Sequence, residues 1–252
     1  FGDIGDAWGG ALAKSVQGNA ALAQGDHARA AACLEEALAV FRERQDGRFV
    51  AGVLDGLGQL ALMRGDEAGA RRAYAESLAL LTALGDKTGI AWSLMGIAGV
   101  AGLAGRGDTA ARLLSAAAAL REAVGARLSP NEQSIHDQIE TGARSVLADA
   151  AFAAAWERGA ALPLADAVAE ARAAVEATPS PGVRSRSLPA GLTPRQLEIV
   201  RLMADGLTDA EIAWHLRISP RTASNHISAI FAKLNVHTRQ SAVHAASLLG
   251  LI

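Results

Sequence analysis

The chain has 252 residues, a single cysteine and a formal net charge of −2, and half of its residues are apolar although only 4% are aromatic. That length accommodates one or two domains with a real core, and one thiol excludes both a disulfide framework and a cysteine-based zinc site. Alanine supplies much of the apolar content, which favours closely packed helices over β-sheets.

No apolar run reaches the roughly 18 residues needed to cross a bilayer, and the first residues lack the basic segment of a signal peptide. A lone thiol is typical of a reducing compartment. We therefore expect a cytoplasmic protein that does not associate with membranes. Because the chain starts at Phe1 without an initiator methionine, we interpret it as a fragment of a longer protein.

The first half of the chain repeats itself. Gly-Asp pairs stand at 25–26, 65–66 and 107–108, and a leucine follows each aspartate after twelve residues. A glycine can end a helix in a left-handed conformation, and an aspartate can cap the next helix. After the second pair, apolar and small residues recur at helical spacing from Ala70 to Leu81. Such helix pairs bury their apolar faces only by stacking, which predicts a superhelix of repeats.

Residues 129–177 continue as helices that we expect to close the array. Ser129-Pro130 begins one helix, and runs at 146–159 and 162–177 predict two more. We expect several side chains of this body to be packed inside it rather than to bind a ligand, namely Trp8, Cys33, Trp92 and Trp156. The concave surface of a repeat array suits a small-molecule or protein effector.

The repeats in residues 1–125 resemble the long tetratricopeptide-like repeats of MalT-like bacterial transcriptional activators. The resemblance implies that this part of the chain acts as a sensor. We assign residues 1–177 to the repeat domain, and residues 178–190, which are rich in Pro, Gly and Ser, to a flexible linker.

The segment 191–252 contains four expected helices. A residue suited to N-capping precedes each of them, at Thr193, Thr208, Ser219 and Thr238, and a Gln or Glu completes a capping box in the first two. A short second helix, a tight turn and a longer third helix make a helix-turn-helix. The third helix has one apolar face, formed by Ala223, Ile227, Ile230 and Leu234. The opposite face carries short polar side chains, which suit entry into a major groove.

The charge distribution agrees with a nucleic-acid partner at this end. Residues 188–252 contain six Lys or Arg residues and four Asp or Glu residues, whereas the rest of the chain is acidic. Such an asymmetry is a weak indication of DNA binding. Trp214 is expected to be a partly exposed packing residue, and the scattered histidines predict no metal site.

The segment resembles the LuxR-type helix-turn-helix domain, on motifs that include Leu192-Thr193-Pro194-Arg195, Gly206-Leu207-Thr208 and Glu211-Ile212-Ala213. The resemblance implies double-stranded DNA as the partner, base reading by the third helix and a homodimer through the last helix. Together with the helical wheel, it places Arg221, Ser224, Asn225 and Ser228 toward the bases. It places Thr193, Thr208, Thr222, His226 and Lys233 at the DNA backbone. His226 has a second interpretation, as a residue that orients its neighbours.

The predicted fold is all-α, with a tetratricopeptide-like superhelix followed by a four-helix LuxR-type domain in residues 191–252. The predicted function is sequence-specific DNA binding in transcription regulation. The alternative is a helical-repeat scaffold whose tail binds a protein partner. No catalytic motif is present, and Gly85-Asp86-Lys87-Thr88 lacks the spacing of a phosphate-binding loop, so we expect neither an enzyme nor a cofactor. An ATP-binding module upstream is implied by the MalT-like resemblance alone.

Overall fold

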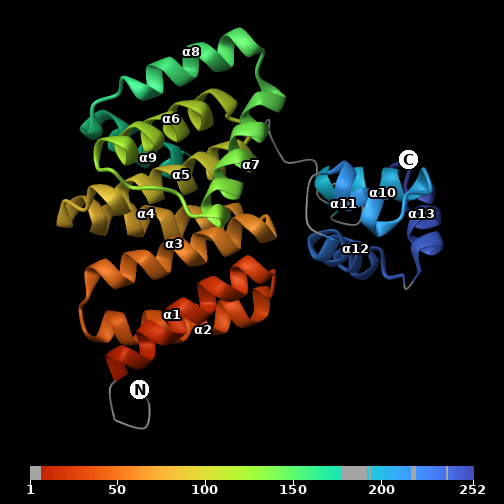
Figure 1. Cartoon of the computed structure of the whole chain (residues 1–252), viewed down its shortest axis with the longest axis horizontal. Coiled ribbons are helices and arrows are strands. Elements are labelled where there is room, and N and C mark those ends of the chain that lie inside the picture. The colour runs from red at the N-terminus through yellow and green to blue at the C-terminus, as the bar shows by residue number, and fades with distance from the viewer. Residues whose placement is uncertain (1–6, 178–191, 193, 217–219, 237) are drawn as a thin grey trace. The chain divides into compact units, whose positions relative to one another are not determined.

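A computed structural model describes residues 7–177, 192, 194–216, 220–236 and 238–252, without the side chains of residues 194, 220–222 and 225. Contacts divide the chain into two compact units, Phe1–Val183 and Arg184–Ile252. The described residues form thirteen α-helices and no β-strand (Figure 1), which confirms the all-α prediction. The linker predicted at 178–190 lies outside the described residues.

The described helices of the first unit are α1 (Ala7–Gln24), α2 (His27–Glu43), α3 (Gly47–Arg64), α4 (Glu67–Leu84), α5 (Lys87–Leu103), α6 (Gly107–Ala123), α7 (Pro130–Val146), α8 (Asp149–Ala160) and α9 (Leu164–Glu176). Those of the second unit are α10 (Pro194–Ala204), α11 (Asp209–His215), α12 (Pro220–Leu234) and α13 (Arg239–Leu248). In the first unit, α1 to α6 stack as successive helix pairs (Figure 1).

Tight turns join these helices and recur every 20 residues. The turn residues with a left-handed backbone, at φ between 55° and 75°, are Gly25, Gln45, Gly65, Gly85 and Gly105. In the first four turns an aspartate follows, and its side chain accepts a hydrogen bond from the backbone N–H three residues further on. These bonds satisfy donors that the first turn of a helix leaves free, so each aspartate starts a helix.

The turn predicted at 107–108 was wrong by two residues. Gly105 is the left-handed residue, and Arg106 takes the N-cap position of α6 without a side-chain hydrogen bond. Gly107 is buried instead, and a Cβ atom there would lie 2.5 Å from Cγ2 of Val146, so it is a close packing position. The turns at 45–46 and 85–86 were not predicted, because one turn was expected for each repeat rather than one for each helix.

The core between α3, α4 and α5 depends on small residues. The ring of Tyr74, only 4% exposed, lies between Gly58 of α3 and Gly96 of α5. The predicted apolar face of α4 is confirmed, because Ala70, Tyr74, Leu78 and Leu81 are all buried. Glycine on both neighbouring helices leaves the space that the ring fills.

A chain of hydroxyl groups crosses the same core. The hydroxyls of Ser77 and Ser93 lie 3.1 Å apart, both side chains are fully buried, and Ser93 Oγ donates to Oδ1 of Asp55 at 3.0 Å. Burial raises the pKa of Asp55 to about 7, and the hydrogen bonds from Ser77 and Ser93 lower it only in part. The repeat body therefore holds a carboxyl group that titrates near neutral pH.

The last helix of the body, α9, packs on α4, α5 and α6. Its buried face consists of small residues, namely Ala167, Val168, Ala171, Ala174 and Val175. Arginines from the repeats hold its end, because Arg71 Nε donates to the carbonyl of Val175 at 2.7 Å and Arg106 Nη2 to that of Ala174 at 2.8 Å. The buried small residues and the hydrogen bonds from the two arginines together hold α9 against the repeats.

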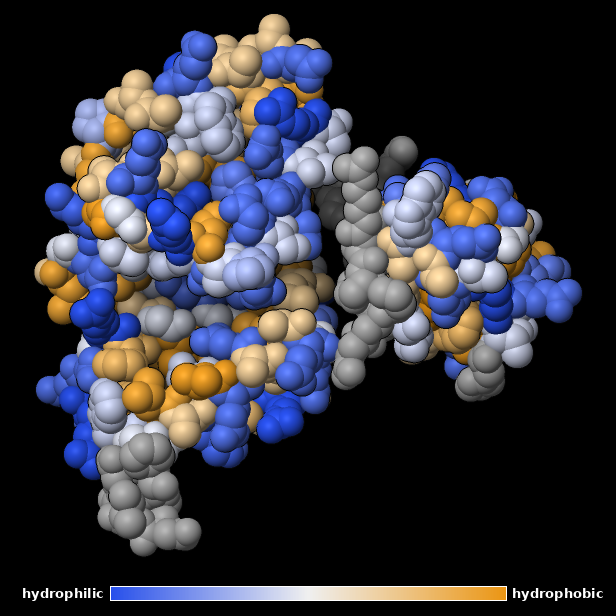
Figure 2. Space-filling model, in the orientation of Figure 1, coloured by the Kyte–Doolittle hydropathy of each residue, from blue (hydrophilic) through white to orange (hydrophobic). Residues whose placement is uncertain are grey.

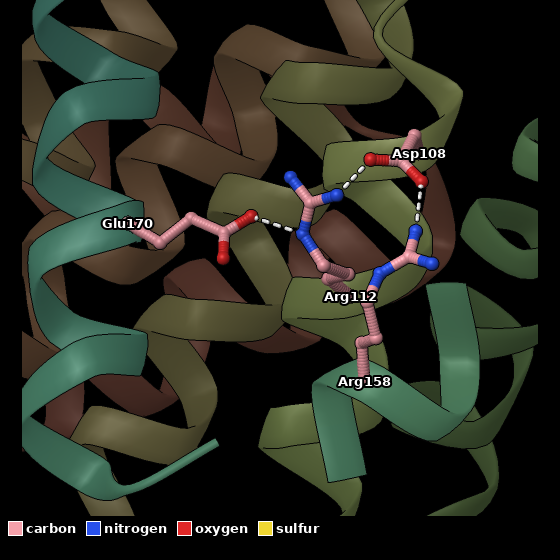
Figure 3. Close-up of polar contacts among 4 residues, drawn as sticks. All are labelled: Asp108, Arg112, Arg158 and Glu170. Carbon is pink, nitrogen blue, oxygen red and sulfur yellow. Dashed lines mark hydrogen bonds and ion pairs between the residues drawn. The ribbon is translucent and has the colours of Figure 1, made fainter. Parts of the chain in front are cut away.

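Ion pairs connect α9 and α8 to α6 (Figure 3). Arg112 of α6 contacts Glu170 of α9 at 2.7 Å and also pairs with Asp108, which in turn accepts a hydrogen bond from Arg158 of α8 at 2.7 Å. The predicted helix at 146–159 starts later, since Val146 ends α7 and α8 begins at Asp149. The helix predicted at 162–177 is observed as α9 with slightly shorter bounds.

The aromatic residues of the body pack as predicted. Trp8 lies edge-on to Phe41 and Phe49 and donates to Oδ2 of Asp46 at 3.2 Å. Trp156 stacks on a phenylalanine of α8, Trp92 packs against the core, and Cys33 is buried. These side chains stabilise the repeats.

The second unit is a four-helix domain around its own core. Ile199, Ile212 and Ile230 are fully buried, and Ala213 and Leu216 are buried beside Ile212 on the inward side of α11. On α10, Ile199 and Val200 are buried and Leu197 packs against the core, whereas Ala204 is exposed. Contacts with α12 and α13 cover the buried side of α10.

Trp214 is 83% exposed, so the prediction of a partly packed residue was wrong. It lies on the solvent side of α11, opposite the buried Ile212 and Ala213. In the view of Figure 2 the apolar residues form small groups among hydrophilic ones. Among the described residues, no helix combines the length and apolarity that a membrane span requires.

Candidate nucleic-acid interface

Helix α12 is the centre of the candidate interface. Ala223, Ile227 and Ile230 are at most 6% exposed and Leu234 is half-buried, which confirms the predicted core face. Contacts with α10, α11 and α13 hold this face in place. The opposite side of α12 is therefore directed to solvent by the packing of the whole domain.

That opposite side carries short polar residues. Ser224 and Ser228 are exposed and lie one helical turn apart, and the exposed Ala232 continues the same row. Small side chains let the helix backbone approach base edges closely, as a major groove about 12 Å wide permits. Arg221 and Asn225 also belong to α12, but their side chains lie outside the described part of the structure.

Lys233, a predicted DNA-backbone contact, is exposed at the end of α12. Its ammonium group donates to Oε1 of Gln196 at 2.8 Å, and Gln196, in the first turn of α10, is only 5% exposed. Gln196 was predicted to complete a capping box with Thr193, which lies outside the described residues. The structure adds a contact between helices that no local pattern predicts.

Thr208 caps α11 as predicted. The carboxylate of Glu211 accepts hydrogen bonds from both the backbone N–H and the hydroxyl of Thr208, each at 2.7 Å, which completes the capping box. The backbone hydrogen bond, followed by the hydroxyl bond, holds the pKa of Glu211 below its usual value. A negative charge already stands at this helix start, so the geometry does not favour a phosphate at Thr208, and that contact stays a prediction.

His226 is half-buried in α12, between the exposed row and the core face. This position agrees with either interpretation of the residue, a DNA-backbone contact or a group that orients its neighbours. The side chain of Thr222 lies outside the described residues. The predicted roles of both residues stay predictions.

Two arginines of the domain brace its turns. Arg195 pairs with Glu198 at 2.7 Å and donates to the carbonyl of Leu216 at 2.9 Å. Arg239 pairs with Asp209 at 2.7 Å and donates to the carbonyl of Leu207. Both guanidinium groups are engaged inside the domain, so only part of its positive charge is available to phosphates. Sequence reasoning missed this, because only the Arg195–Glu198 spacing is a local signal.

A comparison with protein families identifies the second unit. Residues 190–246 match the family model described as bacterial regulatory proteins of the luxR family. These residues form a LuxR-family helix-turn-helix domain. The match includes α10, α11 and α12 and reaches into α13, so the LuxR-type interpretation of this segment is confirmed.

Curated relatives carry regulator names. A protein of Mycobacterium bovis named as an HTH-type transcriptional regulator is 35% identical over 114 residues, which cover 44% of this chain and 12% of that protein. GfsR of Streptomyces halstedii, also named as an HTH-type transcriptional regulator, is 38% identical over 85 residues, or 34% of each chain. The transcriptional regulatory protein DegU of Brevibacillus brevis is 44% identical over 52 residues, or 21% of this chain and 22% of DegU.

These comparisons cover limited parts of the proteins. The chain spans about an eighth of the length of the Mycobacterium bovis relative. The alignment with that relative, at 114 residues, is longer than the helix-turn-helix unit, so the similarity extends into the preceding sequence. No solved structure is significantly similar to the chain.

Proposed function

We propose that the chain belongs to a transcriptional regulator that binds specific DNA sequences through α12. The observation that carries the proposal is the row of exposed small residues on α12, at Ser224 and Ser228, on the side of the helix that faces away from the core. This row lies within the LuxR-family domain, and the names of the similar proteins support regulation of transcription. The lysine and arginine side chains of the domain supply the attraction to phosphates.

The proposal includes a homodimer formed on DNA through α13. Leu248 and Leu249, at the end of this helix, are 76% and 42% exposed, and apolar side chains in such positions are typical of a contact between copies. A dimer would bind two half-sites and gain affinity without new base contacts.

For the repeat body, we propose binding of an effector or a partner protein within a MalT-like regulator. The 40-residue helix pairs and the similarity that extends beyond the DNA-binding unit support this assignment. We assign no catalytic role to the chain and place it in the bacterial cytoplasm, where its DNA partner would be found.

The test is a fluorescence-anisotropy titration of the whole chain with duplexes selected from a random pool, at several salt concentrations. Asn225→Ala should relax the sequence preference. Lys233→Ala should weaken binding to all duplexes alike and reduce the slope of log affinity against log salt by about one. Lys14→Ala, in the repeat body, removes the same charge and serves as the control, with an unchanged slope.

The outcomes separate two functions. Salt-dependent binding that prefers some sequences supports the regulator, whereas a folded chain that binds no duplex at low salt contradicts it. The exposed indole of Trp214 is the observation that favours the alternative scaffold, because a large aromatic side chain on the surface is typical of protein contacts. In that case the domain would bind a protein partner instead of DNA.

A further inference from the structure

One face of α3 remains accessible in the repeat body. Gly52, Asp55, Gln59 and Met63 follow one another at helical spacing along this face, and all four are at least partly exposed. A Cβ atom at Gly52 would meet nothing within 4 Å. We call these four residues the open face of α3. It belongs to the middle of the stack, because α3 packs on both α1 and α5 (Figure 1).

The charged residue of the open face is Asp55. Its Oδ1 atom accepts a hydrogen bond of 3.0 Å from Ser93 of α5, whose hydroxyl lies 3.1 Å from that of Ser77 of α4. Both serines are fully buried, so they hold the half-buried carboxyl group from the core side. Neutral hydroxyl groups of two further helices therefore orient the carboxyl group toward the accessible face.

Asp55 differs from the other acidic residues that pack between helices. Glu170, for example, pairs with Arg112 at 2.7 Å. Among the ion pairs that the described residues form, none includes Asp55. Burial raises the pKa of Asp55 to about 7, and the described residues contribute no cation that would lower it. A cation from a bound partner would supply this attraction, which is stronger at a half-buried carboxylate than in free solvent.

The surroundings of Asp55 indicate the kind of partner. A lysine has a slender four-carbon stem that can reach a half-buried carboxylate while its backbone stays at the surface. Trp92 has in α5 the position that Gly52 has in α3, since the two helices start 40 residues apart, and it is half-buried against the core. Its indole offers apolar surface to such a stem. The accessible face suits an extended segment better than an enclosed small molecule.

The charge of the body points in the same direction. Residues 1–187 contain 18 Lys or Arg residues and 22 Asp or Glu residues, so this part of the chain is acidic. A net negative charge favours the approach of a basic partner.

We propose that the open face of α3 binds a basic segment of a partner protein, with the ammonium group of a lysine placed against the carboxylate of Asp55. The assignment rests on the proposed role of the repeat body in binding a partner, and it adds the chemistry of that partner. Ser93 and Ser77 act as positioning residues behind the carboxylate. The amide of Gln59, one turn further along α3, can pair with the backbone of the bound segment.

The experiment selects random peptides of about twelve residues, displayed on phage, for binding to the whole chain. The selected peptides should share a lysine close to an apolar residue. Calorimetric titration with a synthetic peptide then measures the affinity. Asp55→Asn keeps an acceptor for Ser93 but removes the charge, so affinity should fall about 10- to 100-fold. Replacing the peptide's lysine by norleucine should cause a similar loss, and the two changes together should add little.

Two matched controls accompany these variants. Glu43→Gln removes the same charge at an exposed position of α2 and should change affinity by less than about twofold. Gly52→Phe should block the open face, whereas Gly142→Phe, at an exposed position of α7 where a Cβ atom also meets nothing within 4 Å, should leave binding intact. Thermal melting of each variant checks that the body stays folded.

The opposing results are distinct. Selected peptides without a shared cation would overturn the assignment, and so would peptides that bind Asp55→Asn and Gly52→Phe as tightly as the unmodified chain. In both cases binding of a partner by the repeat body stands, at another site. A library that yields no peptide able to bind the folded chain would overturn both this assignment and the proposed binding of a partner protein.

Discussion

Replacing Gly58 by alanine tests how the repeat core accommodates Tyr74. A Cβ atom at Gly58 would lie 2.7 Å from Cε2 of the ring, well inside ordinary van der Waals contact. The ring cannot withdraw, because Gly96 packs closely against its opposite edge, at Cε1. Gly52, in the same helix, is the matched control, since a Cβ atom there meets nothing within 4 Å.

The magnitude follows from two effects. Alanine is favoured over glycine in a helix interior by about 1 kcal/mol, and this gain applies equally at both positions of α3. Overpacking a closed core costs about 1–3 kcal/mol, and only Gly58 bears this cost. We therefore expect Gly52→Ala to raise the free energy of unfolding of the repeat body by about 1 kcal/mol. The free energy of unfolding of Gly58→Ala should be lower than that of Gly52→Ala by about 1–3 kcal/mol.

The assay is urea unfolding of the whole chain, followed by far-UV circular dichroism, with wild type and both variants side by side. Adding Tyr74→Leu removes the ring, so in that background the two glycine positions should become nearly equivalent. If Gly58→Ala and Gly52→Ala shift the unfolding midpoint alike, or their difference survives the loss of the ring, the glycines do not make room for Tyr74.

Two further predictions concern a titrating carboxyl and a helix cap. The pKa of Asp55 is raised to about 7 in the folded chain, so the free energy of unfolding should fall as pH rises from about 4 to about 7. Asp55→Asn should remove this decline, which is at most about 4 kcal/mol. Unfolding curves measured across that pH range test the prediction. The same decline in both proteins would contradict a raised pKa at Asp55. Thr208→Ala should destabilise the second unit by about 1 kcal/mol through loss of the capping box, as measured by thermal melting. Ser247→Ala, at an exposed position of α13, is the control, and an equal shift in both variants would argue against the cap.

Much of the second unit could be predicted because its signals are local. The capping box at Thr208 and Glu211 and the buried face at Ile227 and Ile230 both follow from spacings of three or four residues along one helix. The same rules do not set the end of the buried face on α10, where Val200 is buried but Ala204, one turn further on, is exposed. An amphipathic pattern shows that a helix has a buried face, but neighbouring helices decide where that face ends.

In the repeat body, the missed turn at 45–46 and the misplaced turn at 105–106 each lack one of the expected residues. Gln45 adopts the left-handed conformation that glycine normally takes, and Arg106 occupies an N-cap position without a capping side chain. Regular spacing of the helices maintains both turns, because each helix must match the length of those it packs against. Packing thus compensated for sequence signals that were weak or misleading.

Local sequence signals established an all-α chain with a helix-turn-helix at its C-terminal end. These signals are helical periodicity, helix caps and the LuxR-type motif, which all depend on residues a few positions apart. The fold alone determined which charges remain available. Arg239 is engaged by Asp209, Lys233 is held by Gln196, and Asp55 has a raised pKa because helices distant in the sequence bury it beside Ser93. Local rules depend on backbone geometry that is the same in every helix, whereas burial and ion pairing depend on partners that only packing brings together.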